Sequence, residues 1–360
     1  MTDIVLAVTL GDPGGIGPEI ALKAAYGHRW PRYLRLVLIG SRRVLSHEAH
    51  HLKLPLPPAW TPSETGPLTA PVVNWEPELD PHQRRNHPVW RPGITGKTQG
   101  QAAAHWIRTA TTGCLSGLFN GMITGPICKQ SLHLAGLPFP GHTEYLAALT
   151  ATRRYAMMLM GGPLRVVLVT RHIPLSRVAD CLSKQAIIEA AELTAPALAW
   201  LNVKNRTIGV CALNPHAGDQ GLLGREEKTT LIPALRSLRR RGIKVQGPIP
   251  ADVIFYQARR RQYGAVLAMY HDQGLAPLKM IAFEQGINLT LGLPILRASP
   301  DHGTAFDIAG QGMANPGSMI AAIRLTARLA RRKNPWAIDS GLKITHPRPS
   351  REGSRLSSPP

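Results

Sequence analysis

Short apolar segments alternate with helix-like segments along most of the chain, and this alternation limits the folds that the chain can adopt. The apolar segments are rich in Val, Ile and Leu and have the length of buried β-strands. They span residues 4–10, 36–40, 121–124, 165–170, 207–213, 265–270 and 288–293. Strands that alternate with helices indicate an α/β fold with a largely parallel central sheet.

Three of the intervening segments carry helical signals. Residues 18–26 follow a glycine-rich turn, and residues 184–201 repeat apolar positions at helical spacing after Ser183, which can cap the first turn. Residues 224–241 have the charge pattern of an exposed helix, although Pro233 predicts a break or a late start. Residues 50–95 are rich in Pro and Trp and lack periodicity, so we expect an irregular segment with one strand at 70–74.

The formal net charge of +20 raises the question of nucleic-acid binding. Much of the excess lies in three short clusters, 239–241, 259–261 and 331–333, each at the end of a helix-like segment, where cations complement the helix dipole. Aromatic residues make up only 5% of the chain and do not interleave with these clusters. The charge therefore favours solvated helix ends, with a general attraction for anionic substrates, over a nucleic-acid interface.

Cysteine spacing and hydropathy indicate the cellular compartment in which the protein is expected. The four cysteines have no CxxC spacing, and Cys128 and Cys211 lie in or beside apolar runs, as in reduced proteins. The N-terminus has the pattern of a strand and not of a signal peptide, and no apolar run reaches the roughly 18–20 residues of a membrane span. These features predict a soluble cytoplasmic protein that does not associate with membranes.

Three histidines follow apolar strand-like runs directly. They are His172, His216 and His271. Ligands bind at the carboxyl ends of strands in open parallel sheets, so the three imidazoles can converge there. Three histidines with an open position suit Zn²⁺ or a similar divalent ion.

Acidic side chains accompany these strand ends. Asp219 and Asp272 follow two of the histidines, and Asp252 lies in another candidate segment. Any of the three can orient a metal-bound imidazole or move a proton, and the residue pattern leaves that choice open.

Two further groups of residues suit an anionic ligand. Lys279, Asn288 and Arg297 each lie near an apolar strand edge and combine a point charge, an amide and a bidentate guanidinium. His142 and Thr143 follow a Gly/Pro turn and precede an apolar helix, where a phosphate or carboxylate site can form. Thr143 acting only as a helix N-cap is the alternative.

Two glycine-containing loops remain. Gly14, Gly15 and Gly17 allow a tight strand-to-helix connection or close approach of a ligand, but the spacing is not GxGxxG. Residues 299–316 are dense in turn formers, and such a loop can wrap a cofactor with backbone groups. Because the glycine spacing at residues 14–17 is not GxGxxG, a Rossmann dinucleotide site is not expected.

Taken in order, these motifs resemble the 4-hydroxythreonine-4-phosphate dehydrogenase family from about residue 4 to about residue 332. The resemblance is carried by TLGDPGGIGPEI, PGHTEYLA, LNPHAGDQGLLGREE, MYHDQGLAPLKM, NLTLGLP and SPDHGTAFDIAGQGMANPGSM. The last segment is also similar to the loop with which isocitrate and isopropylmalate dehydrogenases hold NAD(P). Residues 50–95 and the C-terminal tail match poorly.

The resemblance implies a fold and an assembly. It implies a two-domain isocitrate/isopropylmalate dehydrogenase-like α/β fold, with residues 1–125 plus 270–335 in one domain and 126–269 in the other. A homodimer is expected, with the active site in the interdomain cleft at the dimer interface and one histidine supplied by the partner chain. The tail, 336–360, is expected to be disordered.

The resemblance also assigns site residues. It implies one divalent metal ion, Zn²⁺ or alternatively Mg²⁺ or Co²⁺, on His172, His216 and His271. The substrate residues are His142, Thr143, Lys279, Asn288 and Arg297. The candidate catalytic acids, Asp252 and Asp272, come from the residue pattern and not from the resemblance. NAD or NADP is expected on the loop residues Asp301, His302, Gly303, Thr304, Asp307 and Asn315.

The implied reaction is metal-dependent, NAD(P)-linked oxidation of 4-(phosphooxy)-L-threonine, followed by decarboxylation, in pyridoxine 5′-phosphate biosynthesis. One alternative is a catabolic relative that oxidises a phosphorylated threonate or erythronate, or a cis-dihydrodiol. A basic nucleic-acid-binding protein is the alternative from another class.

Overall fold

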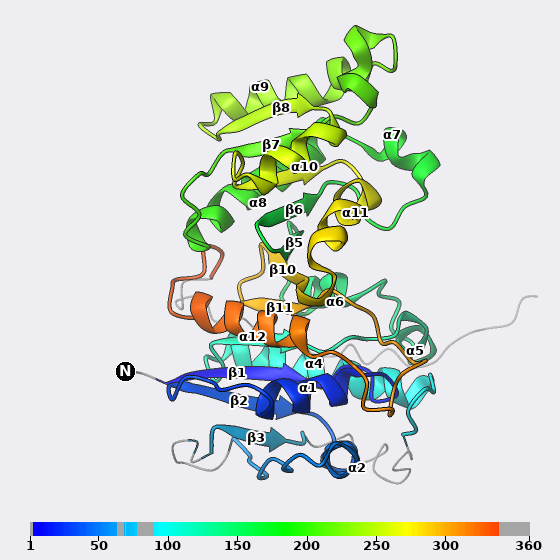
Figure 1. Cartoon of the computed structure of the whole chain (residues 1–360), viewed down its shortest axis with the longest axis vertical. Coiled ribbons are helices and arrows are strands. Elements are labelled where there is room, and N and C mark those ends of the chain that lie inside the picture. The colour runs from blue at the N-terminus through cyan, green and yellow to red at the C-terminus, as the bar shows by residue number, and fades with distance from the viewer. Residues whose placement is uncertain (1–2, 63–67, 69, 78–89, 338–360) are drawn as a thin grey trace, which may run out of the picture.

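The structure, a computed structural model, describes residues 3–62, 68, 70–77 and 90–337. Over those residues the strands form one 11-stranded sheet in the order β3-β2-β1-β4-β11-β10-β5-β6-β9-β7-β8, which runs along the length of the molecule (Figure 1). The strands are β1 (Ile4–Thr9), β2 (Leu34–Ile39), β3 (Val72–Trp75), β4 (Gly121–Thr124), β5 (Ala156–Gly161), β6 (Leu164–Leu168), β7 (Ile208–Cys211), β8 (Val245–Ile249), β9 (Ala265–Ala268), β10 (Ile287–Leu291) and β11 (Arg297–Pro300).

The sheet has two parallel parts joined by an antiparallel centre. Strands β3, β2, β1, β4 and β11 are parallel neighbours, and so are β6, β9, β7 and β8. Between them β10 pairs antiparallel with both β11 and β5, and β5 pairs antiparallel with β6. The α/β class with a mostly parallel sheet is therefore confirmed, while the division into domains at 125, 269 and 335 stays a prediction.

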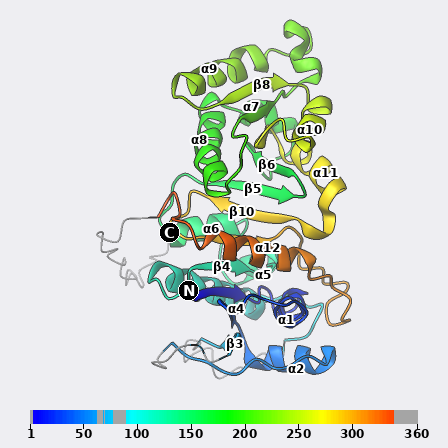
Figure 2. The same cartoon turned by 60° about the vertical axis from the view of Figure 1, so that its left-hand side comes forward.

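Helices cover both faces of the sheet. The longer ones are α1 (Gly17–Tyr26), α2 (Arg42–Leu52), α4 (Lys97–Leu115), α6 (His142–Leu149), α8 (Lys184–Trp200), α9 (Ile232–Arg240), α10 (Ala251–Arg259), α11 (His271–Ala282) and α12 (Gly317–Leu329), with the short α5 (Lys129–Leu134) and α7 (Val178–Cys181). Figure 2 shows α8 on one side of the β5–β8 part and α10 and α11 on the other. Because both faces are covered, strands such as β1 and β7 are apolar almost throughout.

Most of the predicted elements are present. Each predicted strand corresponds to an observed one within a few residues, including β3 in the irregular segment 50–95. Ser183 caps α8, where its hydroxyl accepts the Ala186 amide at 3.1 Å. Pro233 lies in the first turn of α9, directly after a π-helical turn, Glu227–Leu231, so the predicted break corresponds to a change of helix type and the helix does not start late. The predicted tail, 336–360, lies outside the described residues except for its first two.

The backbone of α11 lies directly on the sheet at Gly274. A Cβ there would be 2.6 Å from Cγ1 of Val166 and 3.0 Å from Cβ of Ala268. This contact sets the height of α11 above the sheet, and α11 carries His271 and Lys279. No helix of the described residues is long and apolar enough to cross a membrane.

We expect Gly274→Val to lower the free energy of unfolding by about 1–3 kcal/mol, because the added methyl groups overpack a filled interface. Ala276→Val is the matched control, since Ala276 is exposed on the same helix and should lose only about 0.5 kcal/mol of helix propensity. Urea unfolding measures both values. Equal losses in the two variants would contradict close packing at Gly274.

Candidate active site

A cavity of about 330 Å³ lies where the two parallel parts of the sheet meet. Its walls come from the start of α6, the loop after β6, helix α11, strands β10 and β11, and the loop after β11, all near the middle of the molecule in Figure 1. The sequence-predicted residues that line it are His142, Thr143, His172, His271, Lys279, Asn288, Arg297, Asp301, His302 and Gly303. Segments far apart in the chain thus contribute to one site.

Arg297 is a buried cation that lacks a carboxylate partner among the described residues. Its side chain is 1% exposed, and its guanidinium donates to Oγ1 of Thr124 at 2.6 Å and to Oγ1 of Thr290 at 2.9 Å. Burial lowers the pKa of Arg297 to about 9, with Glu144 acting in the opposite direction. A buried charge that only hydroxyls compensate favours an anionic ligand in the cavity.

His142 stands beside this cation in its neutral form. Its Nε2 donates to the Gly125 carbonyl at 3.0 Å, and burial together with the charge of Arg297 holds the pKa of His142 well below its usual range. Thr143 is buried within the first turn of α6, whereas Gly141 occupies the N-cap position. The interpretation of Thr143 as a simple N-cap is therefore wrong.

Two polar atoms of the cavity wall are buried and have no hydrogen-bond partner in the described part of the chain. They are Oδ1 of Asn288 and Nε2 of His302. His302 donates from Nδ1 to the Gly303 carbonyl at 3.2 Å, which leaves a lone pair on Nε2 in the neutral ring. Because unpaired buried polar groups are costly, both atoms indicate a ligand that would satisfy them.

Two of the three predicted metal ligands converge on the cavity. The rings of His172 and His271 have centroids 5.7 Å apart, and both residues line the wall. Burial, followed by the charges of Lys129 and His271, lowers the pKa of His172 and favours the neutral imidazole, which is the form that binds metals.

His216 lies outside the cavity of its own chain. It is exposed on a turn, Pro215–Gly221, in which it has a left-handed φ of 51°. Buried Glu227 holds the start of this turn by accepting the backbone amides of Leu213 and Asn214 at 2.9 and 2.7 Å. The described residues of one chain accordingly hold no cluster of three metal-binding side chains.

The predicted catalytic acids differ in position. Asp272 is exposed next to the site and contacts Nδ1 of His271 through its Oδ1 at 2.6 Å, which orients that imidazole. Asp252 is exposed in the first turn of α10 and does not line the cavity. Asp301 lies in the wall, where burial raises its pKa against the opposing charges of Lys279, His271 and His302.

Lys129 and Glu144 also line the cavity, and sequence reasoning missed both. Glu144 directly follows the predicted pair His142 and Thr143, so its place in that motif was the available signal. Lys129 begins α5 after strand β4, and extending the strand-end argument to β4 would have identified it.

The glycine-rich turn at residues 14–17 packs against the predicted cofactor loop and leaves no space for a ligand at Gly14 or Gly15. A Cβ at Gly15 would lie 2.8 Å from the Thr304 carbonyl oxygen, and one at Gly14 would lie 2.2 Å from that of Ile94. The Ile16 amide donates to the Thr304 carbonyl at 2.9 Å. The glycines therefore permit close packing of protein segments, which favours the tight-connection interpretation.

An ion pair on α1 holds the other end of the same loop. Buried Glu19 accepts the Ala314 amide and the Lys23 ammonium, each at 2.7 Å. Lys23 also donates to the carbonyls of Gly312 and Ala314, each at 2.8 Å. Of the predicted cofactor residues, Asp301, His302 and Gly303 line the cavity, while Thr304, Asp307 and Asn315 continue the loop beyond it.

The lowered pKa of His142 makes stability depend on pH. Below about pH 6.5 the unfolded chain binds a proton that native His142 does not, so the free energy of unfolding falls with decreasing pH. One such proton corresponds to a slope of at most about 1.4 kcal/mol per pH unit. We expect His142→Gln to make this slope shallower in urea unfolding between about pH 5 and about pH 7. An unchanged slope would mean that His142 titrates normally in the folded protein.

The sequence pattern of the pyridoxal phosphate biosynthetic protein PdxA family matches residues 32–326. The chain is 42% identical to 4-hydroxythreonine-4-phosphate dehydrogenase from Caulobacter vibrioides over 345 residues, which are 92% of this chain and 99% of that protein. The crystal structure of 4-hydroxythreonine-4-phosphate dehydrogenase from Klebsiella pneumoniae matches with a TM-score of 0.79 and 38% identity, covering 91% of this chain and all of that one. A terephthalate 1,2-cis-dihydrodiol dehydrogenase from Burkholderia xenovorans matches less well, with a TM-score of 0.61 and 29% identity over 91% of this chain and 98% of that one.

Proposed function

Because the chain belongs to the pyridoxal phosphate biosynthetic protein PdxA family, we propose that it oxidises 4-(phosphooxy)-L-threonine with NAD⁺ or NADP⁺. The product, 2-amino-3-oxo-4-(phosphooxy)butanoate, loses CO₂ to give 3-amino-2-oxopropyl phosphate for pyridoxine 5′-phosphate synthesis in the cytoplasm. The cavity that joins Arg297, Lys279 and the His172–His271 pair is the observation that carries this proposal.

The substrate phosphate binds at Arg297 and Lys279. Arg297 is a buried guanidinium without a carboxylate partner in the described chain, and Lys279 supplies a second positive charge to the same wall. Asn288 and His142 offer the polar atoms that fix the rest of the substrate. Anchoring the phosphate in this way holds the reacting carbon near the two histidines and lowers the entropic cost of reaction.

A divalent metal ion fits the histidine pair. His172 and His271 supply two neutral imidazoles, and the partner subunit's His216 would supply the third ligand. We assign Zn²⁺, with Mg²⁺ or Co²⁺ as alternatives, because imidazole nitrogens suit such ions. When bound, the ion lowers the pKa of the substrate hydroxyl and stabilises negative charge on the neighbouring oxygen.

The chain's own groups complete the chemistry. Asp272 holds the His271 ring through its Nδ1 contact at 2.6 Å. The loop from Asp301 to Asn315 carries NAD(P), and its first three residues line the cavity, so the nicotinamide would face the substrate carbon that releases hydride. Asp252, outside the cavity of its own chain, keeps its catalytic assignment only as a prediction.

Exposed apolar side chains support a homodimer with shared active sites. Leu222, after the His216 turn, is 84% exposed, and Leu175, after His172, is 71% exposed. Met280 and Phe283, at the end of α11, are 83% and 73% exposed. Large apolar side chains that are this exposed indicate surface that another protein chain covers.

The charge of the same cavity distinguishes among the alternative substrates. A phosphorylated threonate or erythronate fits the anion-binding wall, whereas a cis-dihydrodiol leaves the buried Arg297 charge without a phosphate to neutralise it. The arginine clusters lie at the ends of α9, α10 and α12, as expected for helix C-termini, and this weighs against a nucleic-acid interface.

Activity and its metal dependence are tested together. We expect NADH or NADPH to form when the protein receives 4-(phosphooxy)-L-threonine, to stop after chelation and to resume when Zn²⁺ is restored. Phosphorylated threonate, phosphorylated erythronate and a cis-dihydrodiol serve as comparison substrates at equal concentration. Absence of turnover with every phosphorylated hydroxy acid, despite bound metal, would refute the proposal.

The shared metal site predicts complementation between inactive variants. His216→Ala and His271→Ala should each be inactive as homodimers, because every site lacks one ligand. In randomly mixed dimers half the assemblies are heterodimers with one intact site, so activity should return to about a quarter of wild type. If all three ligands came from one chain, mixing would restore nothing.

A further inference from the structure

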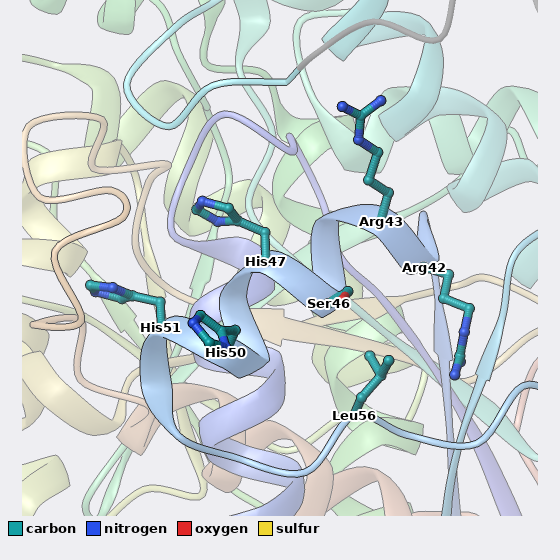
Figure 3. Close-up of a pocket in the computed structure, with 7 residues that line it drawn as sticks. All are labelled: Arg42, Arg43, Ser46, His47, His50, His51 and Leu56. Carbon is teal, nitrogen blue, oxygen red and sulfur yellow. The ribbon is translucent and has the colours of Figure 1, made fainter.

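Basic side chains lie along one exposed face of α2. A surface cavity of about 770 Å³ lies against this helix and is lined by its arginines and histidines, with Leu56 beyond its end. Figure 3 shows Arg43, His47 and His51 projecting to one side of α2, while Arg42 and Leu56 lie on the other. The three side chains are exposed and repeat at four-residue spacing, which places them in a row on one helix face.

This row has little compensating negative charge. Glu48 is the only acid in α2, and its side chain is buried, where burial and the neighbouring charge of Glu19 raise its pKa. Its one described ion pair is with Nδ1 of His47, at 3.8 Å. Arg43 has no carboxylate within ion-pair distance among the described residues. The row therefore keeps the potential to attract an anion.

The row also borders the predicted cofactor loop. A Cβ at Gly312 would lie 3.3 Å from Nε2 of His51. A second cavity, of about 200 Å³, has polar and apolar walls, and its lining residues are Arg43, His47, Glu48, Arg91, Pro13, Val44, Trp90 and Pro92. Pro92 in turn packs against Gly310 of the loop, where a Cβ would lie 2.7 Å from its side chain. Apolar side chains next to a guanidinium and an imidazole suit a purine base that carries a phosphate.

The direction of the loop identifies which end of a dinucleotide reaches this face. Its first residues, Asp301 to Gly303, line the substrate cavity, and Gly312 reaches α2. Hydride transfer requires the nicotinamide at the substrate cavity, so the adenosine end follows the loop toward α2. The β2–α2 connection is also a strand carboxyl end, and ligands of open α/β sheets bind at such ends.

We propose that Arg43, His47 and His51 of α2 form a binding site for a phosphate group at the adenosine end of the cofactor. This inference rests on the proposed dehydrogenase function. The phosphate is either the 2′-phosphate of NADP or the pyrophosphate that NAD and NADP share. A site for the 2′-phosphate affects the binding of NADP only, whereas a site for the pyrophosphate affects the binding of both cofactors.

The test measures dissociation constants of NADPH and NADH by nicotinamide fluorescence with the Zn²⁺-loaded full chain. The double variant Arg43→Gln/His51→Gln should raise the dissociation constant about tenfold or more, because charged hydrogen bonds to phosphate are lost. Arg240→Gln, at an exposed position on α9 near the opposite end of the molecule, is the matched control and should leave both constants unchanged (Figure 1). Circular dichroism checks that the double variant is folded. If the double variant does not fold, the dissociation constants of the single variant Arg43→Glu are measured in its place.

Weaker binding of NADPH alone assigns the 2′-phosphate, and weaker binding of both cofactors assigns the pyrophosphate. Unchanged constants for both cofactors would overturn the α2 site while substrate turnover by wild type still supports the dehydrogenase. If the wild-type protein binds neither cofactor and oxidises no substrate, the proposed function fails and the α2 site fails with it.

Discussion

The antiparallel strand β10 is the constraint on which the site depends. It pairs antiparallel with β11 on one side and with β5 on the other, and β5 pairs antiparallel with β6, so β10 and β5 together join the two parallel parts of the one sheet. Asn288 on β10 and Arg297 on β11 consequently reach the cavity that also receives His271 from α11. The site lies where the two antiparallel strands β10 and β5 connect the two parallel parts of the sheet.

The strands that are apolar and β-branched could be predicted from sequence, because their burial between two helix layers leaves a continuous hydrophobic run. The others could not. Strand β5 is Met-rich, β8 contains Gly247 and Pro248, and β11 consists of Arg, Ala, Ser and Pro, so none resembles a buried β-branched segment. Tertiary pairing, which local propensity does not encode, determines these strands.

Of the three histidines that follow strands, His172 and His271 line the cavity of their own chain and His216 does not. His271 lies three residues after β9 and His172 four residues after β6, so both remain near the sheet edge. His216 lies five residues after β7, on a turn of residues with left-handed φ. Glu227 holds the start of this turn by accepting the backbone amide of Leu213. The spacing after a strand predicts the edge of the sheet at which a residue lies. The path of the intervening loop decides whether its side chain lines the cavity.

The joining of both chain ends in one part of the sheet has a consequence for synthesis on the ribosome. Strand β4 pairs with β11, and α12 packs against β1 and β4, so β4 lacks this neighbour and both strands lack this covering helix until the chain has been made as far as Leu329. Strands β5 to β9 pair among themselves and need only residues up to 268. The middle of the chain can thus fold before the N-terminal strands are complete, and the substrate cavity requires residues as far as Gly303.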